Sequence, residues 1–164
     1  MVTMKLFTTI LLSLGTLVLS VKGAAVPPST WISVEDVSSE FNGNATSLNK
    51  REGAELITCY NAGTKIDRAS SIASIDDFCA KHIGQELKDN EVVSFRYDWG
   101  SFTILISGQA VNGCSFTIDN NCNRLLRKPL DECNTGGENG KQGGFESDIC
   151  STWRFDPGSN GGDA

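Results

Sequence analysis

The chain has 164 residues, with 14 Lys and Arg residues against 20 Asp and Glu residues, so its net charge is −6. It contains six cysteines. A negative charge repels nucleic-acid backbones and anionic membrane surfaces at long range, so we expect no nucleic-acid partner. The segment RLLRK at residues 124–128 is the only local candidate for a basic patch.

The chain opens with an apolar run, LFTTILLSLGTLVLSV, at residues 6–21. This run is short for a bilayer span and is followed by small residues, which is typical of a secretory signal peptide (residues 1–23) cleaved near Gly23. A retained anchor helix is the alternative interpretation. The favoured interpretation predicts a secreted, extracellular protein without stable membrane insertion.

Residues 24–51 are rich in Ser, Asn and Pro and carry no sustained apolar period. We therefore do not expect them to pack into a core. They end on Lys50 and Arg51, a dibasic pair of the kind that kexin-type proteases cut after, and all six cysteines lie downstream. This boundary predicts a pro-segment at 24–51 and a mature chain that begins at Glu52.

Four of the 14 basic residues and three of the 20 acidic residues precede Glu52, which leaves a net charge of −7 downstream. The remaining 113 residues suffice for one small domain, which we place at 52–157, with a flexible tail at 158–164.

The first elements of this domain are a strand, a helix and a hairpin. ELITCYN (55–61) is rich in strand-forming residues, and a helix is expected to start at Ser74 and to end at Gly84. Residues 91–107 alternate between apolar and polar side chains, which predicts a hairpin that reverses near residues 99–101.

The second half continues with a long bent strand over 108–119, in which Asn112 and Gly113 mark either a bulge or a tight turn. A second helix follows from Asn120 or Asn121 to Cys133, with Pro129 expected to kink it or to make its second half irregular. The last strand covers 145–156. The order strand-helix-strand-strand-helix-strand predicts an α+β fold, a four-stranded antiparallel sheet with two helices packed on one face.

An even number of cysteines in a short secreted chain implies disulfide bonds, here three, with fifteen possible pairings. The six residues are Cys59, Cys79, Cys114, Cys122, Cys133 and Cys150. Zinc binding is the competing use of cysteine, but the sequence has no Cys-x2-Cys pair and His82 is its only histidine. We therefore expect no metal site and no cofactor.

The segment CNTGGENGKQGG, residues 133–144, holds five glycines. It does not match a phosphate-binding P-loop, because Thr135 stands where that motif needs glycine and Gln142 where it needs Ser or Thr. Two interpretations stay open. The segment is a structural connector, or it is a ligand loop that hydrogen-bonds sugar hydroxyls through Asn134, Thr135, Glu138, Asn139, Lys141 and Gln142.

The sequence offers few groups for catalysis. The cysteines are expected to be oxidised, and His82 is expected to be a partly exposed histidine on a helix. We therefore predict no catalytic residues and a protein that is not an enzyme. Aromatic residues give the stronger signal for binding: Trp99 lies near the predicted hairpin tip, where a ring is hard to bury, and Tyr97 is a second candidate. Trp153 is assigned to the core.

The leader, the dibasic pair, the six cysteines and the closing run CNTGGENGKQGGFESDICSTWRFDP together resemble a family of small secreted cysteine-rich fungal proteins that are effector candidates. The order of elements is also similar to that of two other families. One is the killer-toxin family of smut fungi, kexin-processed α/β sandwiches, and the other is a mushroom family of lectin-like glycan-binding proteins. The resemblance implies a secreted, non-enzymatic protein whose partner is a carbohydrate or a cell-surface receptor, and no functional residue is carried over from it.

Two hypotheses follow. In the first, a lectin-like module binds glycans through Trp99 and the polar groups of the 134–142 segment. In the second, a killer-toxin-like protein injures competing or host cells, although a net charge of −7 argues against direct attack on membranes. The sequence leaves the oligomeric state open.

Overall fold

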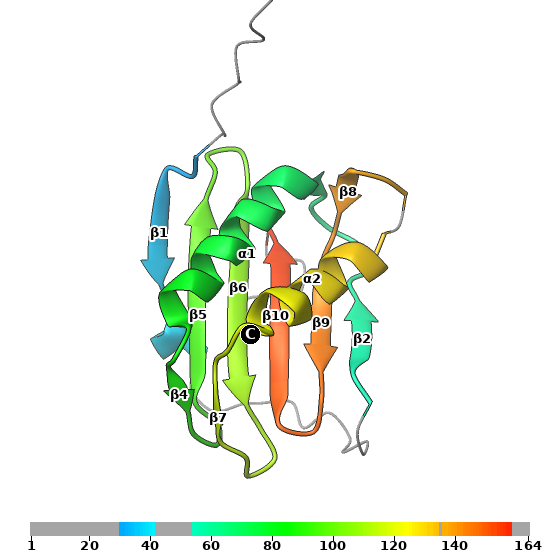
Figure 1. Cartoon of the computed structure of the whole chain (residues 1–164). Coiled ribbons are helices and arrows are strands. Elements are labelled where there is room, and N and C mark those ends of the chain that lie inside the picture. Colours follow the sequence, from blue (N-terminus) through cyan, green and yellow to red (C-terminus); the bar gives the residue numbers. More distant parts are fainter. Residues whose placement is uncertain (1–29, 42–53, 135, 159–164) are drawn as a thin grey trace, which may run out of the picture.

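The computed structural model describes residues 30–41, 54–134 and 136–158, and within them two helices cover one face of an antiparallel six-stranded sheet (Figure 1). The strands of this sheet follow the order β1-β5-β6-β10-β9-β2, and two small sheets pair β3 with β8 and β4 with β7. The predicted α+β class is confirmed. The predicted four-stranded sheet is wrong, because two further strands extend it.

The helices of the described residues are α1 at Arg68–His82 and α2 at Cys122–Glu132, and the 3-10 turn η1 lies at Ser38–Phe41. The strands of the main sheet are β1 Ser33–Asp36, β2 Leu56–Cys59, β5 Val92–Asp98, β6 Thr103–Ala110, β9 Gly144–Ser147 and β10 Ser151–Pro157. The short strands are β3 Ile66–Asp67, β4 Glu86–Leu87, β7 Phe116–Thr117 and β8 Asn139–Lys141. None of the helices in the described part of the chain is long and apolar enough to cross a bilayer.

Helix α1 begins six residues before the predicted start at Ser74, because Asp67 caps it. The Asp67 carboxylate accepts a hydrogen bond from the Ser70 amide at 2.8 Å, which satisfies one of the amides left open at a helix start. Ser74 lies within the helix and is fully buried. Small buried serines let the helix approach the sheet, and they also hide the apolar period from which a helix is predicted.

The core lies between the helices and the sheet. It is built from apolar residues of α1, α2, β5, β6 and β10, among them Phe78, Leu126, Ile106, Trp153 and Phe155. Trp153 is 2% exposed, as predicted for a core residue. Its ring lies over Gly108, where a Cβ atom would stand 2.7 Å from the indole, so glycine is required at that position. The irregular second half expected for the second helix is wrong, because α2 continues through Pro129 to Glu132.

The predicted long strand over 108–119 is wrong, because the chain turns at Asn112 and Gly113. Their φ angles are 61° and 77°, and the Cys114 amide donates to the Val111 carbonyl at 3.1 Å, so the two residues form a tight turn rather than a bulge. Strand β6 therefore ends at Ala110, and β7 belongs to a separate small sheet.

The predicted last strand is also divided, into the hairpin β9–β10. The Asp148 carboxylate accepts hydrogen bonds from the amides of Cys150 and Ser151 at 2.8 and 2.6 Å, which fixes a turn between the two strands. This turn adds one strand to the sheet and leaves β10 between β6 and β9.

The sixth strand comes from the predicted pro-segment. Strand β1 pairs with β5, and Val37 beside it is 1% exposed. The expectation that residues 24–51 do not pack is therefore wrong for residues 30–41. The signal peptide, the Lys50-Arg51 pair and residues 159–164 of the tail lie outside the described residues, and their interpretation stays a prediction.

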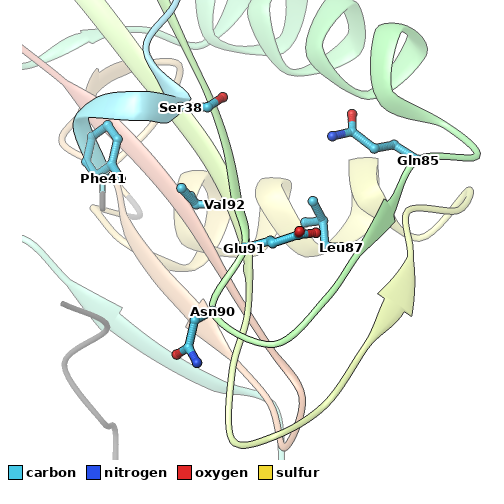
Figure 2. Close-up of a pocket in the computed structure, with 7 residues that line it drawn as sticks. All are labelled: Ser38, Phe41, Gln85, Leu87, Asn90, Glu91 and Val92. Atoms are coloured by element: carbon cyan, nitrogen blue, oxygen red, sulfur yellow. The ribbon is translucent and has the colours of Figure 1, made fainter. Parts of the chain in front are cut away.

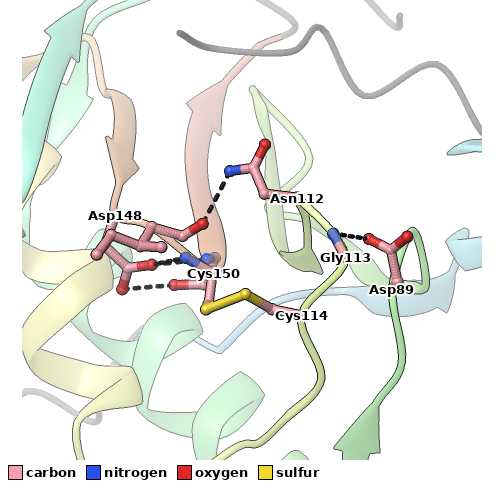
Figure 3. The surroundings of a disulfide bond; sticks show 8 residues. Asp89, Asn112, Gly113, Cys114, Asp148 and Cys150 are labelled. Carbon is pink, nitrogen blue, oxygen red and sulfur yellow. Dashed lines mark hydrogen bonds between the residues drawn. A yellow bond between two sulfur atoms is a disulfide. The ribbon is translucent and has the colours of Figure 1, made fainter. Parts of the chain in front are cut away.

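All six cysteines form disulfides, as predicted, and the pairs are Cys59–Cys133, Cys79–Cys122 and Cys114–Cys150. The first joins β2 to the end of α2, and the second joins the two helices. The third joins the β6–β7 turn to the β9–β10 turn, where Asn112 also donates to the Ile149 carbonyl at 2.8 Å (Figure 3). The disulfides thus fix the helices, the β2 edge and one end of the sheet.

Candidate functional site

Four aromatic rings gather where β5 turns into β6, and we call Trp31, Tyr97, Trp99 and Phe102 the aromatic cluster. The Trp99 ring stacks on Phe102, with centroids 6.1 Å apart, and meets the edge of Trp31 at 5.9 Å. Its indole N–H donates to the Ser74 hydroxyl of α1 at 3.1 Å. Trp99 is half-buried, so it presents part of one ring in a fixed orientation instead of the free ring expected at a hairpin tip.

Tyr97 is completely buried, and its hydroxyl donates to the Asp77 carboxylate of α1 at 2.9 Å. Burial, together with the charge of Asp77, raises the pKa of Tyr97 above its usual range. The Trp31 ring stands edge-on to it at 5.4 Å. Tyr97 therefore supports the cluster from below and offers no surface to a ligand in this structure, so we remove it from the candidate contacts.

The glycine-rich segment is held closed by its own polar side chains. The side-chain amide of Asn134 donates to the Gln142 side-chain carbonyl at 2.8 Å, and its oxygen accepts from the Gln142 backbone amide at 3.2 Å. Lys141 and Gln142 are each 4% exposed, and β8 pairs with β3. These contacts favour the structural-connector interpretation for Asn134, Lys141 and Gln142.

Glu138 and Asn139 are the exposed polar residues that remain from this part of the candidate site, whereas Thr135 lies outside the described residues. The loop contacts α1 at Arg68, whose amide donates to the Glu138 carbonyl at 2.8 Å. Trp99 contacts the same helix at Ser74, which is about 9 Å further along its axis. The hairpin tip and β8 lie at the same end of the molecule (Figure 1).

A charged cluster on the sheet face away from the helices was missed by the sequence analysis. Arg154 pairs with Asp156, donates to the Tyr60 hydroxyl at 3.1 Å, and lies 5.8 Å from the Phe41 ring and 5.6 Å from the Phe145 ring. Burial raises the pKa of Tyr60 above its usual range. Arg154 and Asp156 are 5% and 0% exposed, so with Phe41 in place this cluster is closed to solvent.

A hollow of about 430 Å³ opens beside η1 (Figure 2). It is lined by Ser38, Phe41, Gln85, Leu87, Asn90, Glu91 and Val92. The Glu91 carboxylate is already engaged, since it accepts the Lys88 amide at 2.9 Å. One wall of this hollow comes from the segment that precedes Lys50, so its shape depends on whether that segment stays in place.

Two titratable residues lie in unexpected surroundings. His82, predicted to be partly exposed, is 8% exposed between Phe78 and Phe95, with a hydrogen bond of 2.8 Å between its Nδ1 and Gln85.

Glu146 is fully buried, and neither carboxyl oxygen has a hydrogen-bond partner among the described residues. Burial, followed by the negative charges of Asp148 and Glu55, raises the pKa of Glu146 to about 8.

These groups do not assemble into a metal site, since the described residues hold no set of three His, Cys, Asp or Glu side chains placed to bind an ion. Comparison of the chain with family models, with curated proteins and with solved structures gave no match. The function is therefore inferred from the surfaces described above.

Proposed function

We propose that this is a secreted, non-enzymatic binding protein that recognises a glycan at a cell surface through the aromatic cluster. The observation that carries the proposal is the state of Trp99, a half-buried tryptophan whose indole is fixed by Ser74 and by stacking on Phe102. A ring held in place loses little conformational entropy when a ligand stacks on it.

Sugar recognition also needs polar groups beside the ring, to orient the hydroxyls of the ligand. Ser101 is exposed next to Trp99, and Ser33 is exposed on β1 opposite Asp98 in the strand register. Glu138 and Asn139 are exposed on the loop at the same end of the molecule. The proposal assigns the ring contact to Trp99 and hydrogen bonding to these side chains.

Secretion is part of the proposal. Three disulfides in a small domain are typical of proteins that fold in an oxidising compartment, and the apolar leader predicts export. The disulfides also support binding, because they hold the sheet and helices that position Trp99 and so reduce the entropy lost on association.

Glycan-array binding of the purified secreted protein tests the proposal, with Trp99→Ala as the site variant and Phe116→Ala as the matched control. Phe116 is also a half-buried aromatic residue, but it lies on β7 at the other end of the sandwich (Figure 1). We expect Trp99→Ala to lower the affinity at least about tenfold, equivalent to 1.4 kcal/mol, and Phe116→Ala to leave it unchanged.

Near-UV circular dichroism shows whether both variants keep the native packing. Equal affinities of the wild-type protein and a folded Trp99→Ala variant would exclude Trp99 from the site. Growth inhibition of yeast by purified protein that binds no glycan would reject the proposal in favour of the killer-toxin-like alternative.

A further inference from the structure

We infer that the outer edge of β5 is a binding site for an extended peptide strand, and that residues 31–41 of the chain are its first occupant. This inference does not rest on glycan binding, although Trp31 belongs both to this segment and to the aromatic cluster. It concerns a different surface chemistry, in which the partner is recognised by backbone pairing and a few side-chain anchors.

The backbone contacts follow β5 from Ser94 to Asp98. Strand β1 pairs antiparallel with β5 from Ser33 opposite Asp98 to Asp36 opposite Phe95. The pairing is extended at both ends, since the Ile32 amide donates to the Asp98 carbonyl at 2.6 Å and the Val37 amide to the Ser94 carbonyl at 2.9 Å. Without this segment, the edge of β5 would expose unpaired backbone groups, which is the condition under which a sheet accepts an added strand.

Side chains anchor the segment on both faces of the sheet. Trp31 stands on Tyr97 on the helix side, whereas Phe41 lies over Arg154 on the other side. Val37 is 1% exposed between these two anchors.

Polar contacts add to these anchors. The Ser38 hydroxyl accepts the Ser94 amide at 2.9 Å, and Glu40 pairs with Arg96 at 3.4 Å. The site therefore selects an extended, acidic peptide that carries an aromatic residue and an aliphatic residue six positions further on.

The segment can be separated from the rest of the protein. Residues 24–51 contain no cysteine, and the three disulfides connect only residues from 59 to 150. The Lys50-Arg51 pair lies between β1 and β2 in the chain. Cutting there leaves the segment bound without a covalent link, and it removes the high effective concentration that a tether gives. A second peptide of the same chemistry then competes for the edge.

Peptide exchange on the full chain tests this inference. A recognition sequence for a specific protease replaces residues 45–50, so that the cut does not depend on a kexin-type enzyme. A fluorescein-labelled peptide with the sequence of residues 30–41 is titrated into cut and uncut protein, and its anisotropy is measured. We expect saturable binding to the cut chain and at least about tenfold weaker binding to the uncut chain, whose tethered segment fills the edge.

Two variant peptides identify the contacts. Val37→Asp places a charge at the buried anchor and is expected to weaken binding at least about tenfold, whereas Ser39→Ala changes an exposed side chain and serves as the matched control. Equal binding of the two variants would overturn the inference.

A segment that stays bound after cutting would block the labelled peptide. The Val37→Asp substitution is therefore also made in the chain itself, and native mass spectrometry is used to follow release of its segment. After release, binding of the wild-type peptide, or recovery of the near-UV signal if the chain has lost its packing, supports the inference. If neither binding nor recovery is observed, the inference is contradicted.

Discussion

The two edges of the main sheet are protected in different ways. Strand β2 is tied to α2 by the Cys59–Cys133 disulfide, and Glu55 beside it pairs with Arg124 at 2.7 Å and with Lys128 at 2.8 Å. Strand β1 is held by hydrogen bonds, by ring contacts and by burial of Val37. An exposed edge invites pairing with another chain. This protein closes one edge covalently and the other with a segment that lies before a predicted cleavage site.

Breaking the covalent edge is expected to have the largest effect. Replacing Cys59 and Cys133 together by serine removes a cross-link between residues 74 apart in sequence. The unfolded chain regains the entropy that the cross-link had removed, which lowers the free energy of unfolding by about 4 kcal/mol. Urea unfolding at pH 7 measures it, and a loss below about 1 kcal/mol would show that α2 holds β2 without the disulfide.

Glu146 on β9 makes the β2 side of the sheet sensitive to pH. Its pKa is raised to about 8 in the folded protein, so the folded state binds a proton that the unfolded chain releases near pH 4.5. Its contribution to stability is therefore complete below pH 4.5 and is lost as pH rises through 8.

We expect wild-type protein to be less stable at pH 9 than at pH 5 by on the order of 3 kcal/mol from this group, and Glu146→Gln to remove that difference. Urea unfolding of both proteins at the two pH values measures it. A variant with the wild-type pH dependence would assign the effect to another group.

Val37→Asp in the intact chain is expected to open the β1 edge alone. A charge at this buried position costs roughly 2 kcal/mol or more, which the weak pairing of a four-residue strand does not offset. Amide hydrogen exchange should become faster at Ser94, whose amide donates to Ser38, while Tyr60 beside β2 keeps its protection. Ser39→Asp, at an exposed position, is the control and should change neither amide.

The ion pairs of Glu55 are expected to have the smallest effect. Hydrogen bonds from Arg124, and next from Lys128, lower the pKa of Glu55 to about 2. Its contribution is therefore present above its unfolded pKa of 4.5 and is lost as pH falls through 2. Because these groups face solvent, Glu55→Gln should cost less than about 1 kcal/mol at pH 7, and the cost should decrease in 1 M salt. A cost that is independent of salt would indicate a packing effect.

The sequence predicted the elements in which one face is clearly apolar. Most of residues 91–107 alternate between apolar and polar side chains, and they form β5 and β6 with a reversal at the expected place. Strand β1 was missed because an edge strand needs few apolar residues, and Glu35 and Asp36 are both exposed on it. The β9–β10 turn was missed because it is fixed by one side chain, Asp148, inside a run that otherwise favours a strand.

The candidate site was predicted in part for a similar reason. Trp99 lies at the hairpin end as expected, but alternation alone does not tell which face the helices cover. Tyr97 points to that face and is buried. Lys141 is buried and pairs with Ile66 of β3. This partner lies 75 residues earlier in the chain, so no local sequence pattern reveals it.

Hydrogen exchange of the intact, oxidised chain in increasing urea tests the difference between the two edges most directly. The amides of Val37 on the β1 side and Tyr60 on the β2 side both donate to backbone carbonyls of neighbouring segments, so their opening free energies can be compared. We predict that Val37 exchanges through a local opening of lower free energy than that of Tyr60. Equal opening free energies at the two amides, both matching global unfolding, would contradict the existence of a separable edge strand.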